Sequence, residues 1–145
     1  MYKLSSVIVI LVAITSFVAC RKYEEGPNIS FRTKNARITN NWRIESALVQ
    51  GVEKSLDPYY AKQKHYFYSN GDYVVTIIDA VTLEAENLQG NWTFFDNDKK
   101  VALTIRKPIT QKDSTTEYHI LKLYNKQLWL RKTDNTEELH FVPFE

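Results

Sequence analysis

Cysteine, methionine, glycine and proline are scarce in this sequence. Its 145 residues include one Cys, one Met, four Gly and four Pro. A single thiol excludes an internal disulfide and any zinc or iron–sulfur site held by several cysteines. Four glycines offer no glycine-rich loop for a phosphate group. The formal net charge of +2 gives no electric field that would attract nucleic acid over a distance.

Aromatic residues, in contrast, are abundant. The chain holds nine Tyr, seven Phe and three Trp, and 43% of its residues are hydrophobic against 25% charged. Aromatic side chains favour strands, and the balance of apolar and charged residues is that of an ordinary soluble domain. The composition therefore indicates one domain that is rich in β-structure.

Residues 1–19 have the organisation of a secretory signal peptide. One cation, Lys3, precedes the apolar run of residues 7–14, and Ala19 is the small residue expected before a cleavage point. The apolar stretch of about 13 residues is short for a bilayer span, which needs about 20. We predict cleavage after Ala19; the alternative is an uncleaved N-terminal anchor.

Cys20, the one cysteine, follows Ala19 directly. This placement resembles the lipobox of bacterial lipoproteins, with Phe17 at the position where that motif usually has Leu. The resemblance implies that Cys20 is acylated at its sulfur and amine, for example by palmitate. The acyl chains on Cys20 would hold the protein on the bacterial outer membrane, as part of the cell envelope, because several chains anchor far better than one. The alternative for Cys20 is a free thiol in an exposed tail.

Residues 20–37 are predicted to form a lipidated tether, because glycine, proline and charged residues interrupt any regular period there. Residues 29–31 include two apolar side chains that a pure spacer does not need, so they either lie extended against the domain or contact it loosely. The stretch Lys22–Glu25 resembles a short signal that sends some lipoproteins to the cell surface, although Tyr23 interrupts it.

Residues 38–145 are predicted to form the folded domain. Alternation of apolar and polar residues indicates eight strands: residues 42–49, 65–68, 73–78, 90–95, 100–105, 116–123, 127–131 and 138–143. In the first strand, Trp42, Ile44, Ser46 and Leu48 are expected on one face. Residues 59–64 are predicted to form one helical turn.

The clearest hairpin has its turn at residues 69–72, and two registers compete for it. A two-residue type I′ turn would pair Tyr68 with Tyr73, whereas a type I turn with Gly71 as a bulge would pair Phe67 with Tyr73. We favour the second register, because the first would bury Asp72 and a threonine beside Phe67.

Eight short antiparallel strands joined mostly by tight turns favour an all-β, up-and-down meander that closes into an eight-stranded barrel. Closure removes the exposed strand edges that an open sheet of this size would carry. The alternative is a β-sandwich of two sheets.

Several short motifs follow one another in this domain: Trp42, then Phe67 four residues before Gly71, then Tyr73, Gly90-Asn91-Trp92, Ile120 with Leu123, and Leu128 with Leu130. In this order they resemble the small lipocalin-like lipoproteins of the Bacteroidota, and the resemblance covers nearly all of the domain. It implies an eight-stranded barrel and, for most members, no established biochemical role. The long C-terminal helix and paired cysteines of larger lipocalins are missing here, so a roomy ligand cup is not implied.

Residues for catalysis or metal binding are not grouped in the sequence. The three histidines, His65, His119 and His140, fall on three predicted strands without the short spacings of a metal site. No serine lies in a nucleophile-elbow motif, and carboxylate pairs such as Glu137 with Glu138 are expected to be solvated charges. We therefore expect no catalysis, no metal and no cofactor.

The aromatic residues are the candidates for ligand binding. Six of them could line a barrel cavity or fill it: Trp42, Phe67, Tyr73, Trp92, Phe94 and Trp129. Two functions follow: a membrane-anchored barrel that binds a small apolar ligand, or an envelope scaffold whose filled barrel docks a protein through its outer face and tether. Aromatic and basic residues also interleave in residues 62–66 and 125–132, but an exported protein has little access to nucleic acid.

Overall fold

The computed structural model describes residues 32–78, 82, 84–107 and 111–145. The predicted signal peptide, Cys20 and the apolar residues 29–31 lie outside the described residues, so the predictions made for them stay predictions. Within the described ranges, no helix is both long and apolar enough to cross a bilayer.

The described residues form nine strands and two short helices. The strands are β1 (Asn40–Val49), β2 (Val52–Glu53), β3 (Lys64–Phe67), β4 (Asp72–Ile78), β5 (Ala85–Phe95), β6 (Lys100–Ile105), β7 (Ser114–Leu123), β8 (Leu128–Lys132) and β9 (Glu137–Pro143). The helices are α2 (Lys34–Ile38) and α3 (Pro58–Ala61), the second of which was predicted as a helical turn.

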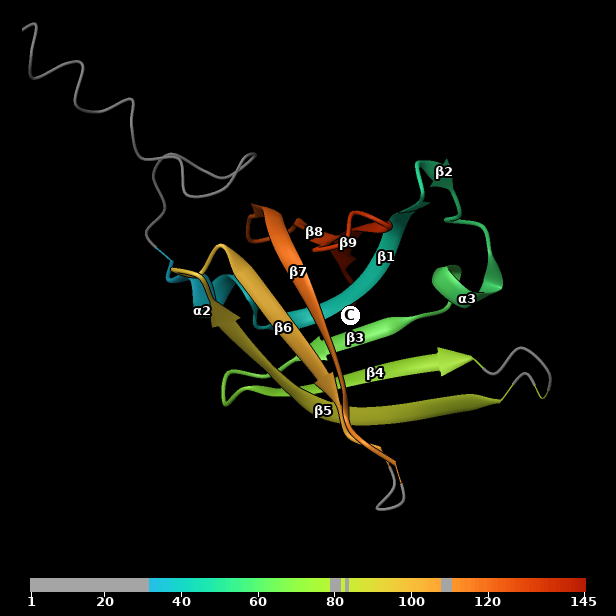
Figure 1. Ribbon diagram of the computed structural model, residues 1–145, viewed down its shortest axis with the longest axis horizontal. Coiled ribbons are helices and arrows are strands. Elements are labelled where there is room, and N and C mark those ends of the chain that lie inside the picture. The colour runs from blue at the N-terminus through green and yellow to red at the C-terminus, as the bar shows by residue number, and fades with distance from the viewer. Residues whose placement is uncertain (1–31, 79–81, 83, 108–110) are drawn as a thin grey trace, which may run out of the picture.

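Eight of the strands close into an antiparallel barrel (Figure 1). They pair in the order β1-β3-β4-β5-β6-β7-β8-β9, and β9 returns to pair with β1 from Trp42 opposite Pro143 to Val49 opposite Glu137. The two-residue strand β2 only extends the far end of β1. The prediction of eight strands in a closed up-and-down barrel is confirmed, and the sandwich alternative is wrong because one continuous sheet closes on itself.

The β3–β4 hairpin has the predicted register. Phe67 pairs with Tyr73, and Gly71 has a φ of 91°, a left-handed conformation that glycine adopts without steric cost. The N–H of Gly71 donates to the carbonyl of Tyr68 at 3.1 Å. Phe67, Tyr73 and Val75 are consequently buried in the barrel interior.

The first strand differs from the prediction in its second half. A register shift between Ile44 and Ser46 interrupts the pairing of β1 with β9, and a β-bulge of this kind changes which residues point inward. Ala47 is therefore fully buried, whereas Ser46 and Leu48 are only half-buried. The expectation that Ser46 and Leu48 share the inner face with Trp42 is wrong.

One end of the barrel is closed by α2. Thr33 caps this helix by accepting a hydrogen bond from the N–H of Ala36, and Ile38, its last residue, is fully buried. The indole of Trp42 donates to the carbonyl of Ile38 at 2.8 Å, and the guanidinium of Arg37 donates to the carbonyl of Leu123 at 2.9 Å. Residues 34–37, which were predicted to belong to the tether, are thus part of a helix that packs on the barrel.

The other helix, α3, lies at the opposite end of the barrel (Figure 1). The carboxylate of Asp57 caps it by accepting a hydrogen bond from the N–H of Tyr59, and Pro58 occupies the first turn, where its missing N–H costs nothing. None of its four residues is buried, whereas α2 buries Arg37 and Ile38. The two ends of the barrel are therefore covered differently.

Gly90 marks a close approach between β5 and β6. It pairs with Ile105, and a Cβ atom placed on Gly90 would overlap the carbonyl oxygen of Thr104. Because this oxygen belongs to the backbone of the neighbouring strand, it cannot swing away as the end of a side chain could. The glycine of the Gly-Asn-Trp motif is required by strand packing.

We expect Gly90→Ala to lower the free energy of unfolding by about 1 to 3 kcal/mol, the cost typical of overpacking a well-packed interior. Chemical denaturation of the purified domain measures this change. Gln89→Ala, an exposed change on the same strand, is the control and should stay within about 0.5 kcal/mol of the original protein. Equal stability of the two variants would contradict the close-approach argument.

Candidate ligand-binding site

The six aromatic residues predicted as a ligand site separate into three groups. Trp42, Phe67, Tyr73 and Trp92 are buried in the barrel interior. Phe94 is half-buried and packs edge-on against Trp92, with 5.2 Å between the ring centroids. The sixth residue lies on the outer face of the barrel.

That residue, Trp129, sits between Leu128 and Leu130, which are both fully buried. Since side chains alternate along a strand, the indole of Trp129 points away from the core. It stacks on the ring of His140, with 4.0 Å between the centroids, and the Lys122 ammonium lies 3.8 Å from its centroid. Trp129 therefore cannot line the barrel interior as predicted.

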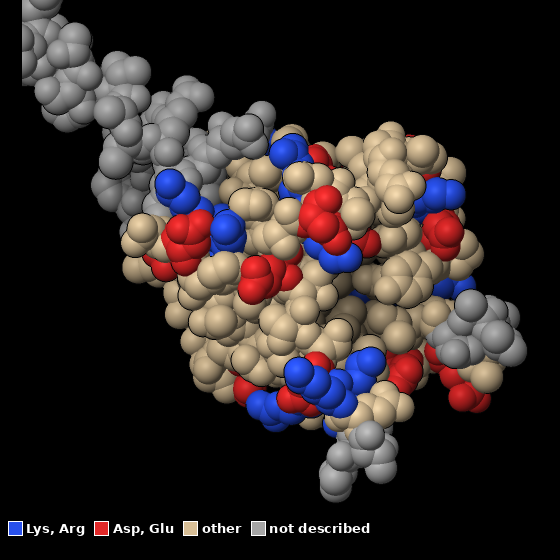
Figure 2. Space-filling model, in the orientation of Figure 1, with Lys and Arg blue, Asp and Glu red and all other residues tan. Residues whose placement is uncertain are grey.

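A cavity of about 180 Å³ opens at the α3 end of the barrel. Figure 2 shows the surface hollowed between β7 and α3, two of the elements that line the cavity. Its apolar wall comes from β4, β5 and β6, with Val75, Ile77, Leu88, Leu103 and Ile105. Of the six predicted aromatic residues, only Tyr73 is among the lining residues.

His65 forms one polar group of the cavity lining. Its Nδ1 lies 2.7 Å from the Tyr73 hydroxyl and its Nε2 lies 3.1 Å from Oε1 of Gln63. Since an amide oxygen only accepts, the imidazole carries its proton on Nε2, and Nδ1 accepts from Tyr73. Burial lowers the pKa of His65 to about 3, so the ring is neutral. Burial also raises the pKa of Tyr73, which stays a hydroxyl donor.

Glu137 forms the second polar group. Its carboxylate accepts hydrogen bonds from the hydroxyls of Tyr60 at 2.9 Å and Tyr118 at 3.3 Å. Burial is the main cause that raises the pKa of both tyrosines, and the negative Glu137 carboxylate raises it further. The carboxylate and two protonated phenols thus face the cavity together.

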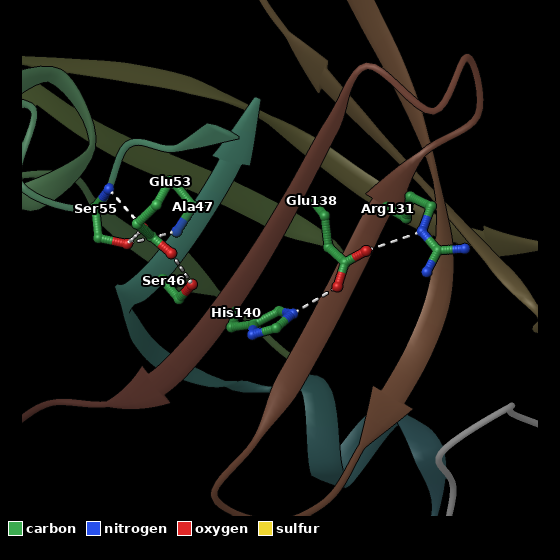
Figure 3. A network of polar contacts seen from close by, with 7 residues as sticks. All are labelled: Ser46, Ala47, Glu53, Ser55, Arg131, Glu138 and His140. Carbon is green, nitrogen blue, oxygen red and sulfur yellow. Dashed lines mark hydrogen bonds and ion pairs between the residues drawn. The ribbon is translucent and has the colours of Figure 1, made fainter. Parts of the chain in front are cut away.

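Glu138, the neighbour of Glu137, lies on the outer face with a different set of partners (Figure 3). Its carboxylate accepts from Nε2 of His140 at 2.7 Å and from Nε of Arg131 at 2.9 Å. Burial opposes ionisation of Glu138, but these hydrogen bonds outweigh it and lower the pKa. Glu137 and Glu138 were expected to be two solvated charges. Instead, the Glu137 carboxylate faces the cavity and the Glu138 carboxylate belongs to an ion-pair network.

The described residues contain no group of three or more His, Cys, Asp or Glu side chains arranged to hold a metal ion. Of the three histidines, His65 faces the cavity and His140 faces outward. Their ring nitrogens are engaged with Gln63, Tyr73 and Glu138. Both nitrogens of His65 and Nε2 of His140 therefore already have protein partners.

No protein-family model matches the chain, and no curated protein matches it. Solved structures, in contrast, are similar to it. A lipocalin-like protein from Bacteroides uniformis ATCC 8492 superposes with a TM-score of 0.59 and 10% identity, over 74% of this chain and 99% of its own. The fold is lipocalin-like. A DUF4847 family protein from Bacteroides vulgatus ATCC 8482 is similar with a TM-score of 0.50 and 10% identity, over 73% of this chain and 93% of its own. At such identities the likeness concerns the fold alone.

The buried His65 should make the stability of this lipocalin-like barrel depend on pH. Burial lowers its pKa from 6.5 to about 3, so between these values the unfolded chain binds a proton that the folded chain does not. The free energy of unfolding should therefore fall as the pH drops below about 6.5, by at most about 1.4 kcal/mol per pH unit. Denaturant titrations between about pH 7 and pH 4.5 measure this slope.

His65→Gln should flatten the slope, because the amide does not titrate and can still hydrogen-bond to Gln63 and Tyr73. His119→Gln is the control, since His119 is half-buried on β7, and it should keep the slope of the original protein. An unchanged slope in His65→Gln would show that other groups cause the pH dependence.

Proposed function

We propose that the protein is a lipid-anchored, non-catalytic binding protein that holds a small ligand in the mouth of its lipocalin-like barrel. The observation that carries the proposal is the asymmetry of the barrel interior. Large aromatic side chains and α2 fill one end, whereas the α3 end keeps a cavity of about 180 Å³ with polar groups on its lining.

The size of the cavity limits the ligand. Pockets for drug-sized ligands start at about 300 Å³, and 180 Å³ corresponds to roughly six water molecules at about 30 Å³ each. A lipid or a porphyrin does not fit. The hydroxyls of Tyr60, Tyr73 and Tyr118 favour a ligand that is polar at one end and apolar at the other, in place of the purely apolar ligand expected from the sequence.

The anchoring part of the proposal rests on the sequence, through the leader of residues 1–19 and Cys20. The described chain begins at Arg32, at the α2 end, which is opposite the mouth (Figure 1). Between Cys20 and Arg32 the chain reaches at most roughly 40 Å when fully extended. Attachment through Cys20 would therefore hold the closed end nearer the membrane and leave the mouth free to meet its ligand.

Ligand binding is tested by ligand-observed NMR with a library of small compounds, each of about ten non-hydrogen atoms or fewer. We expect at least one compound to bind saturably to the mature chain. Leu88→Trp, which fills the cavity from β5, should weaken that binding at least about ten-fold. Trp129→Leu changes an aromatic residue on the outer face and serves as the control. Binding that persists in Leu88→Trp, or no binding at all, would contradict the proposal.

Anchoring is tested in a bacterial host with the full chain. Metabolic labelling with a palmitate analogue should mark the original protein, which should sediment with membranes. Cys20→Ser should lose the label and move to the soluble fraction, whereas Ser16→Ala, a change within the leader that keeps the cysteine, should do neither. Membrane association of unlabelled Cys20→Ser would favour the uncleaved anchor.

A second candidate function, a scaffold that docks an envelope protein, is favoured by the outer aromatic residues. Tyr66 packs edge-on against Phe144 with 5.6 Å between the ring centroids, and Trp129 stacks on His140. Aromatic residues are enriched at protein interfaces. Scaffolding predicts that Trp129→Leu loses a co-purifying protein while Leu88→Trp keeps it, the reverse of the result expected for ligand binding.

A further inference from the structure

We infer that the ligand of the barrel mouth is a small alkylammonium cation, held by the Glu137 carboxylate and the surrounding tyrosine rings. This inference rests on the proposed function, and it assigns the chemical class of the ligand. It follows from the charge, the free hydrogen-bonding capacity and the aromatic content of the cavity lining.

The lining carries a single formal charge. Among its described residues there is no Lys or Arg, and Glu137 is the one carboxylate. His65, the remaining titratable base, is neutral because it is buried between Tyr73 and Gln63. A molecule in the cavity therefore meets one negative charge that is balanced by no positive charge on the lining.

Glu137 also has unused hydrogen-bonding capacity. A carboxylate has about four lone-pair sites, and within the described chain Tyr60 and Tyr118 donate to it. The two nearest cationic residues in the sequence have other partners: Lys132 pairs with Asp134 and Arg131 pairs with Glu138. An ammonium N–H can occupy a remaining lone pair of Glu137 and form a charge-assisted hydrogen bond.

The tyrosine rings suit the alkyl part of such a cation. Tyr59, Tyr60, Tyr73 and Tyr118 all line the cavity, and Tyr59 packs edge-on against Tyr60 with 5.0 Å between the ring centroids. Aromatic faces attract ammonium groups through the ring quadrupole. The apolar lining residues Val75, Ile77 and Leu88 would contact the alkyl groups.

Other ligand classes fit the lining less well. An anion would be repelled by Glu137 and would find no cation to offset its own desolvation. A purely apolar molecule would shield the remaining lone pairs of the Glu137 carboxylate from water without offering them a donor, and a buried hydrogen-bonding group that loses a partner costs about 1 to 3 kcal/mol. The lining thus selects by charge as well as by size.

Three molecules that share a tert-butyl group and differ in charge test the inference: tert-butylammonium, tert-butanol and pivalate. Dissociation constants for the mature chain are measured by calorimetry and ligand-observed NMR at about pH 7. We expect tert-butylammonium to bind at least about ten-fold more tightly than tert-butanol, a factor in keeping with cation–π attraction in a desolvated site. Pivalate should bind most weakly.

Two variants test whether Glu137 causes the preference for tert-butylammonium. Glu137→Gln keeps the shape of the side chain and should reduce the preference for tert-butylammonium over tert-butanol to about two-fold or less. The matched control is Glu138→Gln, which changes the adjacent carboxylate on the outer face and should keep the preference. If Glu137→Gln fails to fold, Thr116→Lys adds a cation to the lining from β7 and should reverse the order of tert-butylammonium and pivalate.

Each outcome decides one of the two proposals. Equal binding of the three molecules, tighter binding of tert-butanol or pivalate, or a preference that survives in Glu137→Gln would overturn the ammonium inference and leave ligand binding in place. The ammonium inference would also be overturned if none of the three molecules binds while library compounds without an ammonium group do. Loss of that binding in Leu88→Trp would leave ligand binding in the cavity in place. Failure of every compound to bind would overturn the proposed function with it.

Discussion

The interior of this protein depends on the double pairing of β1. Asn40–Arg43 pair with β3, and Trp42–Val49 pair with β9, so a single strand joins the two ends of the sheet. The bulge between Ile44 and Ser46 bends β1 and lets it serve both neighbours. An eight-stranded barrel closed in this way has an interior just wide enough for side chains or for one small ligand. Which of the two occupies each level of the barrel is then decided by side-chain volume.

The sequence distributes that volume unevenly. Toward the α2 end, Trp42, Phe67 and Trp92 are all buried in one core cluster, and Phe67 and Trp92 have 5.9 Å between their ring centroids. At the α3 end no tryptophan is among the lining residues. Aliphatic side chains there face tyrosine rings, and the remaining space of about 180 Å³ is edged by polar groups. Those groups bond mainly to one another, which fixes their orientation before any molecule enters and lowers the entropic cost of binding.

Strand alternation was sufficient to predict the eight strands, the closed barrel and the β3–β4 register, because hydrophobic period and turn chemistry are local signals. The bulge in β1 could not be predicted, since no residue between Ile44 and Ser46 marks it. Trp129 was misplaced by its aromatic character, although its position between Leu128 and Leu130 indicates an outward side chain. Tyr118 and Glu137 come to one rim because β7 and β9 flank β8 in the meander. Tyr60 lies far from both in the chain, and only barrel closure brings α3 to the same rim.

The attachment of α2 to the barrel has a mechanical consequence. The described chain enters the fold through this helix, which is held by the Arg37 guanidinium on Leu123 and by the ion pair of Lys34 with Asp98 at 2.9 Å. A pulling force on the N-terminal side of Arg32 is therefore borne by α2 before it reaches any strand. Under tension this short helix would detach first and expose the indole of Trp42, while the β1–β9 seam and the opposite rim stay intact.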